Sequence, residues 1–126
     1  MTAPARILVV DDDDGILGFV TEALAEEGYE VLAARDGAEA LELATREPPD
    51  LILLDMRMPA MDGWQFAAAY RSRPGPHAPI IVMTAARDAP GIANEIHAQG
   101  CLAKPFTLTD LLDVAARFAR QRAEAV

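Results

Sequence analysis

Short runs of apolar residues recur along this chain, and each is followed by a stretch with a longer hydrophobic period. Runs of three or four such residues are too short for helices, and their lack of alternation is typical of strands buried on both faces. The pattern predicts five strands, at Ile7–Val10, Val31–Ala34, Leu51–Leu54, Ile80–Met83 and Cys101–Ala103.

The stretches between these strands have helical spacing. The first helix has an apolar face that includes Phe19 and Val20 and ends near Gly28, a residue that favours helix termination. The second is opened by Asp36 with Glu39, which have capping-box spacing, and ends before Pro48.

Three further helices complete the pattern. Asp62 and Gln65 have capping spacing ahead of the third helix. The fourth, about Ala89–Gln99, has Gly91 in its first turn and is therefore predicted to be the weakest. The fifth places apolar residues on one face from Leu108 to Ala119.

Five strand–helix pairs predict an α/β fold: a parallel sheet with right-handed crossovers and helices on both faces, which is a doubly wound architecture. In such a sheet the carboxyl ends of the strands meet at one edge, where ligands bind. Four of the five predicted strands end in polar residues. The chemistry is therefore expected at that edge.

Charge and composition narrow the class of partner. The 126 residues include 11 basic and 20 acidic side chains, for a net charge of −9, which argues against nucleic acid or an anionic membrane as the main partner. No apolar run approaches the roughly 20 residues needed to span a bilayer, and residues 1–6 lack a signal pattern, so we expect a cytoplasmic protein. Cys101 is the single cysteine, which excludes an internal disulfide.

The polar residues at the strand ends form one candidate site: Asp11, Asp12, Asp55, Thr84 and Lys104. Carboxylates about 4 Å apart would repel by roughly 4 kcal/mol per pair at an effective dielectric near 20, which a bound cation would offset. Mg²⁺ fits best, because it takes a few hard oxygen ligands and keeps several waters. With an ammonium and a hydroxyl opposite, such a site suits a phosphoryl group attacked by a carboxylate.

Each of these features also has a simpler interpretation. A run of four aspartates, Asp11–Asp14, is most often a solvated loop or a helix start, and a lysine before proline is usually exposed. A calcium loop fails on register: with Gly15 as the sixth position, Val10 and Thr21 occupy the first and twelfth positions, where acids belong. The convergence of the whole set favours the functional interpretation.

The chain strongly resembles the receiver domain of two-component response regulators. The resemblance covers essentially all of residues 1–126, which we interpret as a single receiver domain, and it implies a five-stranded flavodoxin-like (βα)5 fold with strand order 2-1-3-4-5. The matching motifs occur in family order and spacing: Ile7-Leu8-Val9-Val10-Asp11-Asp12, Leu53-Leu54-Asp55-Met56-Arg57-Met58-Pro59 with Asp62-Gly63, Thr84-Ala85, and Lys104-Pro105-Phe106.

The resemblance implies a role for each matched residue. Asp55 would accept a phosphoryl group from a phosphohistidine of a sensor histidine kinase or phosphotransfer protein. Asp12 would bind Mg²⁺ directly and Asp11 mainly through a metal-bound water, with Asp55 and the backbone carbonyl of Arg57 as further ligands. In addition, Thr84 would donate to a phosphoryl oxygen, Ala85 would keep access open, Lys104 would pair with the phosphate, and the Lys104–Pro105 peptide would be cis.

Two rival functions follow from the same residues. A phosphatase resembling the haloacid dehalogenase family would carry a second aspartate two residues after the nucleophile, where this chain has Arg57. A degenerate receiver used only for binding would lack Asp12, Asp55 or Lys104, and all three are present. We therefore expect a phosphorylation-controlled switch that acts on no external substrate and signals to a downstream protein through its fourth helix, fifth strand and fifth helix.

Three positions are expected to adjust this switch. Arg57 and Ala86 lie two residues beyond Asp55 and Thr84, where they would set the lifetime of the phosphorylated state, with Arg57 reaching towards Asp13, Asp14 or the phosphoryl group. Cys101 occupies the position where most members of the family carry an aromatic ring. Without that ring we expect incomplete switching, although a packing substitution without functional effect is an equally good interpretation.

Overall fold

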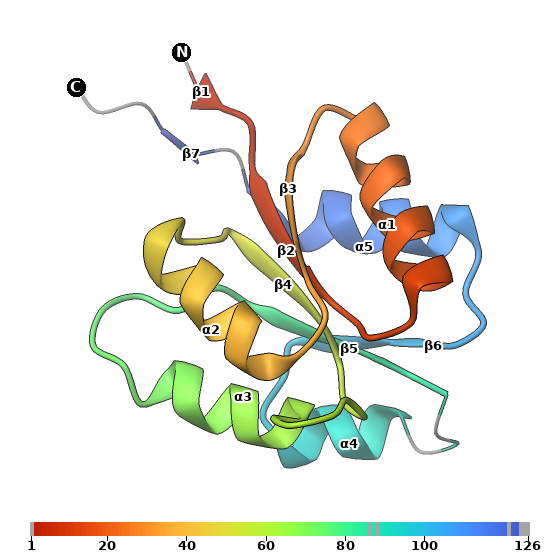
Figure 1. The fold of residues 1–126 in the computed structure, drawn as a ribbon. Helices are drawn as coiled ribbons and strands as arrows, with labels where there is room; N and C mark the ends of the chain where they lie inside the picture. Colours follow the sequence, from red (N-terminus) through yellow and green to blue (C-terminus); the bar gives the residue numbers. More distant parts are fainter. Residues whose placement is uncertain (1, 86, 88, 121, 124–126) are drawn as a thin grey trace.

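A five-stranded parallel sheet forms the centre of the molecule (Figure 1). The computed structural model describes residues 2–85, 87, 89–120 and 122–123. The strand order is β3-β2-β4-β5-β6, which is the expected order 2-1-3-4-5 when these five strands are numbered along the chain. The strands are β2 (Arg6–Val10), β3 (Glu30–Ala34), β4 (Leu51–Asp55), β5 (Ile80–Thr84) and β6 (Gly100–Ala103).

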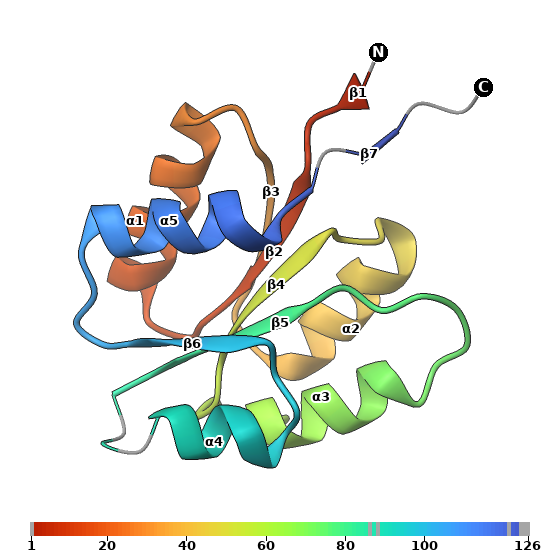
Figure 2. The ribbon, with the colours of Figure 1, turned by 180° about the vertical axis from the view of Figure 1, so that it is seen from behind.

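Helices cover both faces of the sheet, as the pattern predicts. Helices α1 (Asp14–Glu26) and α5 (Leu108–Phe118) lie together on one face, and α2 (Gly37–Arg46), α3 (Gly63–Arg71) and α4 (Ala89–Glu95) lie on the other (Figures 1 and 2). Every residue of β4 and β5 is buried between these two layers, which accounts for their continuous apolar runs. In the part of the chain that the structure describes, no helix is both long and apolar enough to cross a membrane.

The predicted helix starts are confirmed. The Asp36 side chain accepts a hydrogen bond from the Glu39 N–H at the start of α2. At the start of α3, Asp62 and Gln65 form a reciprocal capping box in which each side chain accepts from the other's backbone N–H. This cap fixes the loop that leads from the end of β4 into α3.

Helix α4 is shorter than expected, because it ends at Glu95 and not near Gln99. His97 adopts a left-handed backbone conformation with φ of 56°, and the Ala98 N–H returns to the Ala93 carbonyl at 2.7 Å. The Arg71 guanidinium donates to the carbonyls of the two residues that follow the helix end. These bonds satisfy the carbonyls at the helix end and stop the helix one turn early.

Two apolar residues assigned to buried helical faces are exposed. Phe19 on α1 has 44% of its surface accessible, and Leu108 at the start of α5 has 48%. The buried face of α1 consists of Leu17, Val20 and Leu24. A short antiparallel pair that the pattern did not predict joins β1 (Thr2–Ala3) to β7 (Arg122–Ala123).

Candidate functional site

The sheet register brings the predicted site residues to one edge. Asp55 and Thr84 are the last residues of the adjacent strands β4 and β5. Asp11 directly follows β2, and its N–H donates to the Ala34 carbonyl at 3.0 Å, so the sheet hydrogen bonding continues one residue past the strand. Lys104 follows β6, and its N–H donates to the Thr84 carbonyl at 2.8 Å. Backbone hydrogen bonds thus hold Asp11 and Lys104 in position beside Asp55.

One ammonium group connects two carboxylates in this site. Lys104 Nζ donates to Asp11 Oδ2 at 2.8 Å and to Asp55 Oδ1 at 3.4 Å. Asp11 is fully buried, Asp55 is 6% exposed, and only 16% of the Lys104 side chain is accessible. In such a protected setting an ion pair is much less screened than at the surface. The Lys104–Pro105 peptide is cis, as the resemblance implied.

Burial and charge shift the titration of these groups. Burial, followed by the negative charge of Asp11, raises the pKa of Asp55 from 3.8 to about 6, against the opposing effect of Lys104. Burial on its own would lower the pKa of Lys104, but the hydrogen bond and charge of Asp11 outweigh it, and the pKa is raised. Lys104 therefore stays protonated at neutral pH, and Asp55 is mainly ionised there.

The donor set fits a hard divalent cation. Carboxylate oxygens of Asp11, Asp12 and Asp55 lie within 4.8 Å of one another, with Asp12 exposed and the other two buried. The site combines these three carboxylates with one ammonium, that of Lys104, so its net charge is negative when all four groups are ionised. Oxygen ligands from a few carboxylates, with solvent able to reach one of them, match the preference of Mg²⁺ for partial hydration.

Comparisons with known proteins agree with this geometry. The family model for the response regulator receiver domain matches residues 7–116. This chain belongs to the response regulator receiver domain family.

Individual relatives show the same relationship. The receiver domain is 41% identical over 112 residues to the transcriptional regulatory protein PdtaR of Mycobacterium tuberculosis, covering 86% of this chain and 54% of PdtaR. It is 42% identical over 112 residues to the response regulator MprA of a Mycobacterium species, covering 86% of this chain and 48% of MprA. The chain spans about half the length of these curated relatives.

Solved structures show the same fold. The chemotaxis response regulator CheY4 of Vibrio cholerae superposes with a TM-score of 0.84 at 34% identity, covering 92% of this chain and 99% of that one. The fold is therefore that of a flavodoxin-like receiver domain of two-component systems.

The four consecutive aspartates have four different environments. Asp11 and Asp12 belong to the acidic cluster. The Asp13 side chain caps α1 by accepting from a backbone N–H in its first turn, while the Asp13 N–H donates to Asp11 Oδ1 at 2.9 Å. Asp14 forms an exposed ion pair with Arg35 at 2.8 Å. The helix-start interpretation thus holds for Asp13, and the metal-site interpretation is limited to the first two residues.

Arg57 forms no ion pair with Asp13 or Asp14, and its reach towards a phosphoryl group stays a prediction. Its side chain is exposed, and it makes no ion pair with any residue that the structure describes. Asp14 is already paired with Arg35, which lies at the end of β3 and reaches it across the sheet edge. The Arg57 N–H instead donates to Asp55, a hydrogen bond that lowers the carboxyl pKa. The part of its carbonyl as a metal ligand stays a prediction.

The remaining positions named from the sequence are Thr84, Ala85, Ala86 and Cys101. Thr84 is buried at the end of β5, whereas Ala85 beside it is exposed and lines a hollow that also borders Lys104. Ala86 lies outside the described residues. Cys101 is half-buried on β6 opposite Val82 and packs against the apolar cluster beneath α3 and α4.

An apolar hollow beside the site was missed by the sequence analysis. It has a volume of about 290 Å³ and borders Lys104, with the exposed Phe19 as part of its wall. Its lining comprises Ile16, Phe19, Ala85, Lys104, Pro105 and Phe106. Phe19 and Val20 are neighbours on the same apolar stretch, so spacing alone could not separate the exposed ring from the buried side chain.

Proposed function

We propose that this receiver domain, residues 1–126, is a phosphoacceptor switch in which Asp55 receives a phosphoryl group from a phosphohistidine of a sensor histidine kinase or phosphotransfer protein. The observation that carries the proposal is the shared contact of Lys104 with Asp11 at 2.8 Å and Asp55 at 3.4 Å within an acidic cluster. A phosphoryl group on Asp55 would lie close enough to the Lys104 ammonium to form an ion pair with it.

In the proposed reaction a carboxylate oxygen of Asp55 attacks phosphorus. The new O–P bond forms as the P–N bond to the imidazole breaks, and the imidazole leaves with the electron pair and takes up a proton. Lys104 turns from the carboxylates towards the phosphoryl oxygens, and the Thr84 hydroxyl donates to another of them. The small side chain of Ala85 leaves the approach open.

Asp11, Asp12, Asp55 and the backbone carbonyl of Arg57 would hold Mg²⁺. When bound, Mg²⁺ supplies positive charge that offsets repulsion between the carboxylates and the incoming phosphoryl group. The need for it follows from charge: the product carries about 1.5 to 2 negative charges in place of the single charge of the Asp55 carboxylate, beside two further carboxylates. The dependence on a divalent cation is therefore part of the proposal.

Acetyl phosphate tests this function without a partner protein. In the presence of Mg²⁺ we expect the protein to gain one phosphoryl group, which borohydride trapping and peptide mapping should locate at Asp55. Asp113→Asn, an exposed change on α5 that removes the same charge, serves as the control and should label normally. Label that persists in Asp55→Asn, or that forms equally well with a chelator present, would contradict the proposal.

The remaining proposals concern partners and setting. We propose that the phosphorylated domain signals to a downstream protein through the face formed by α4, β6 and α5, on which Leu108 is exposed. The net charge of −9 supports a protein partner over nucleic acid or a membrane. The domain would act in the cytoplasm and take part in its own phosphorylation and dephosphorylation without turning over an external substrate.

A further inference from the structure

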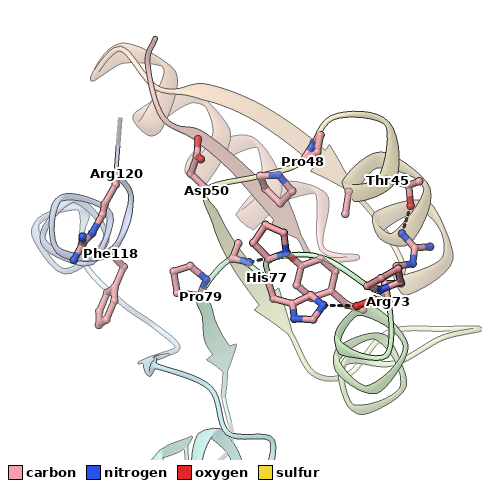
Figure 3. A pocket seen from close by; sticks show the side chains of 14 residues that line it. Thr45, Pro48, Asp50, Arg73, His77, Pro79, Phe118 and Arg120 are labelled. Atoms are coloured by element: carbon pink, nitrogen blue, oxygen red, sulfur yellow. Dashed lines mark hydrogen bonds between the residues drawn. The ribbon is translucent and has the colours of Figure 1, made fainter. Parts of the chain in front are cut away.

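A second hollow lies at the amino ends of β4 and β5, at the opposite end of the sheet from Asp55 (Figure 3). Its volume of about 790 Å³ is within the range of sites that enclose small ligands. Its walls come from the end of α2 and the loop after it, the end of α3 and the loop into β5, and the end of α5. The lining includes Asp50, Tyr70, Arg73, His77, Phe118 and Arg120.

Hydrogen bonds hold these walls in place. The Arg73 guanidinium donates through Nη1 to the Leu41 carbonyl and to the Thr45 hydroxyl, which joins the loop after α3 to α2. The Ala78 N–H donates to the Tyr70 hydroxyl at 2.8 Å, and His77 Nε2 donates to the Arg73 carbonyl at 2.8 Å.

Proline adds to this rigidity. Five of the lining residues are prolines, whose backbone φ is fixed by the ring. The hollow is therefore preformed, and binding there would require little ordering of the protein.

The charge of this hollow is opposite in sign to that of the chain. Two guanidiniums, Arg73 and Arg120, line it against one carboxylate, Asp50, whereas the whole chain carries a net charge of −9. Asp50 Oδ2 accepts from the Arg6 N–H at 2.7 Å. Among the described residues, no acceptor meets Arg120 or the Nη2 group of Arg73, so both guanidiniums have donors for an anion.

Aromatic rings and prolines make up much of the rest of the lining. The Phe118 ring forms part of one wall next to Arg120, and Arg73 with Thr45 lies on the opposite side (Figure 3). The His77 ring lies edge-on to the Tyr70 ring, with centroids 5.2 Å apart. Arginine forks bind carboxylate in two parallel hydrogen bonds, and ring faces bind planar groups.

We propose that this hollow, bounded by Arg73 and Arg120, is a binding site for a small planar anion of the aromatic carboxylate class. The carboxylate would accept from Arg120, and the ring would lie between the prolines and Phe118. The site is at the amino ends of β4 and β5, whereas Asp55 and Thr84 are at their carboxyl ends. It is therefore separate from the phosphorylation site, and its existence does not depend on the function proposed for Asp55.

Titration of the ¹⁵N-labelled protein with 2-naphthoate, without Mg²⁺, tests this proposal. We expect saturable amide shifts at Tyr70, His77, Ala78 and Phe118, with a dissociation constant of about 1 mM or below, as is typical for a ligand of this size. The uncharged analogue 2-naphthamide should bind about tenfold more weakly or not at all, because it lacks the charge that the arginine donors recognise.

Two variants separate the site from general charge effects. Arg120 is exposed and forms no hydrogen bond or ion pair with the described residues, so Arg120→Gln should leave folding intact and weaken 2-naphthoate binding by about fivefold or more. Arg35→Gln removes the same charge at the opposite edge of the sheet and should leave binding unchanged. The proposal is overturned if no shift saturates by about 10 mM, if the amide binds as tightly as the carboxylate, if Arg120→Gln has no effect, or if the shifts cluster around Lys104.

Discussion

Replacing Asp55 by asparagine is predicted to stabilise the protein when no metal is present. Burial and the charge of Asp11 raise the pKa of Asp55 from 3.8 to about 6, so the folded state binds a proton that the unfolded state has already lost. When the pKa of a carboxyl is higher in the folded state than in the unfolded state, its contribution to stability is fully present at pH values below the pKa of the unfolded state. That contribution is lost as the pH rises through the pKa of the folded state. Above about pH 6, ionised Asp55 therefore opposes folding.

The pKa difference gives the size of the effect. The interval between 3.8 and about 6 corresponds to about 3 kcal/mol at neutral pH. Asparagine keeps the shape without the charge but weakens the contact with Lys104, so we expect a gain of roughly 1–3 kcal/mol at pH 7.5. The gain should fall to about half at pH 5, where Asp55 is largely protonated in the folded state, and should continue to fall below that.

Urea denaturation of both proteins in a chelating buffer measures this gain. The midpoint should rise in Asp55→Asn at pH 7.5 with the slope unchanged, so that the difference reflects stability alone. Asp113→Asn removes the same charge from an exposed position on α5 and should shift the midpoint little. Added Mg²⁺ should stabilise the wild type more than Asp55→Asn and narrow the gap. A variant no more stable than the wild type at pH 7.5, or one with the same gain at pH 5, would refute the reasoning.

Three further predictions follow from particular contacts. Lys104→Ala leaves the fully buried Asp11 without its ammonium partner and should cost about 3–5 kcal/mol of unfolding free energy in chelator, with part of the loss restored by Mg²⁺ in thermal melts. Gly63→Ala places a Cβ within 2.6 to 2.8 Å of Met56 and of the Asp55 carbonyl and should cost about 2 kcal/mol or more, whereas Gly18→Ala on α1 meets no atom within 4 Å and should gain about 0.5–1 kcal/mol by urea denaturation. Relaxation-dispersion NMR on the beryllofluoride-bound protein should detect two conformers, because Cys101 provides no aromatic ring to stabilise one of them; a single conformer unaffected by Cys101→Ala would contradict this.

The composition of the acidic cluster was predictable from local sequence and from general rules of parallel sheets, whereas the strand order was implied by the family resemblance. Buried strands appear as continuous apolar runs, and their carboxyl ends must share one edge. That rule is enough to bring Asp11 and Asp55 together, and the structure places their carboxylates with that of Asp12 within 4.8 Å. The direct bond from Lys104 to Asp11 was not predictable, since it depends on the path of the loop after β6.

The features missed from the sequence depend on tertiary contacts. Helix α4 was expected to continue to Gln99, but Arg71 from α3 binds the carbonyls at its end, and no local pattern indicates that contact. Of the partners expected for Arg57, Asp14 is instead paired with Arg35, a contact that forms only once β3 and α1 are assembled. Likewise, the hollow between Arg73 and Arg120 joins loops that only the fold brings together.

The unequal distances from Lys104 would connect the proposed metal binding to the proposed phosphorylation. One ammonium serves two carboxylates, and it lies nearer to the buried Asp11, at 2.8 Å, than to Asp55, at 3.4 Å. A cation held at Asp11 would offset the charge of the carboxylate that lies nearest to Lys104 and would weaken that contact. The ammonium would then be available to Asp55 and to a phosphoryl group on it. On the proposed function, the divalent cation and Lys104 would therefore not supply charge independently, because binding of the cation would determine which carboxylate Lys104 contacts.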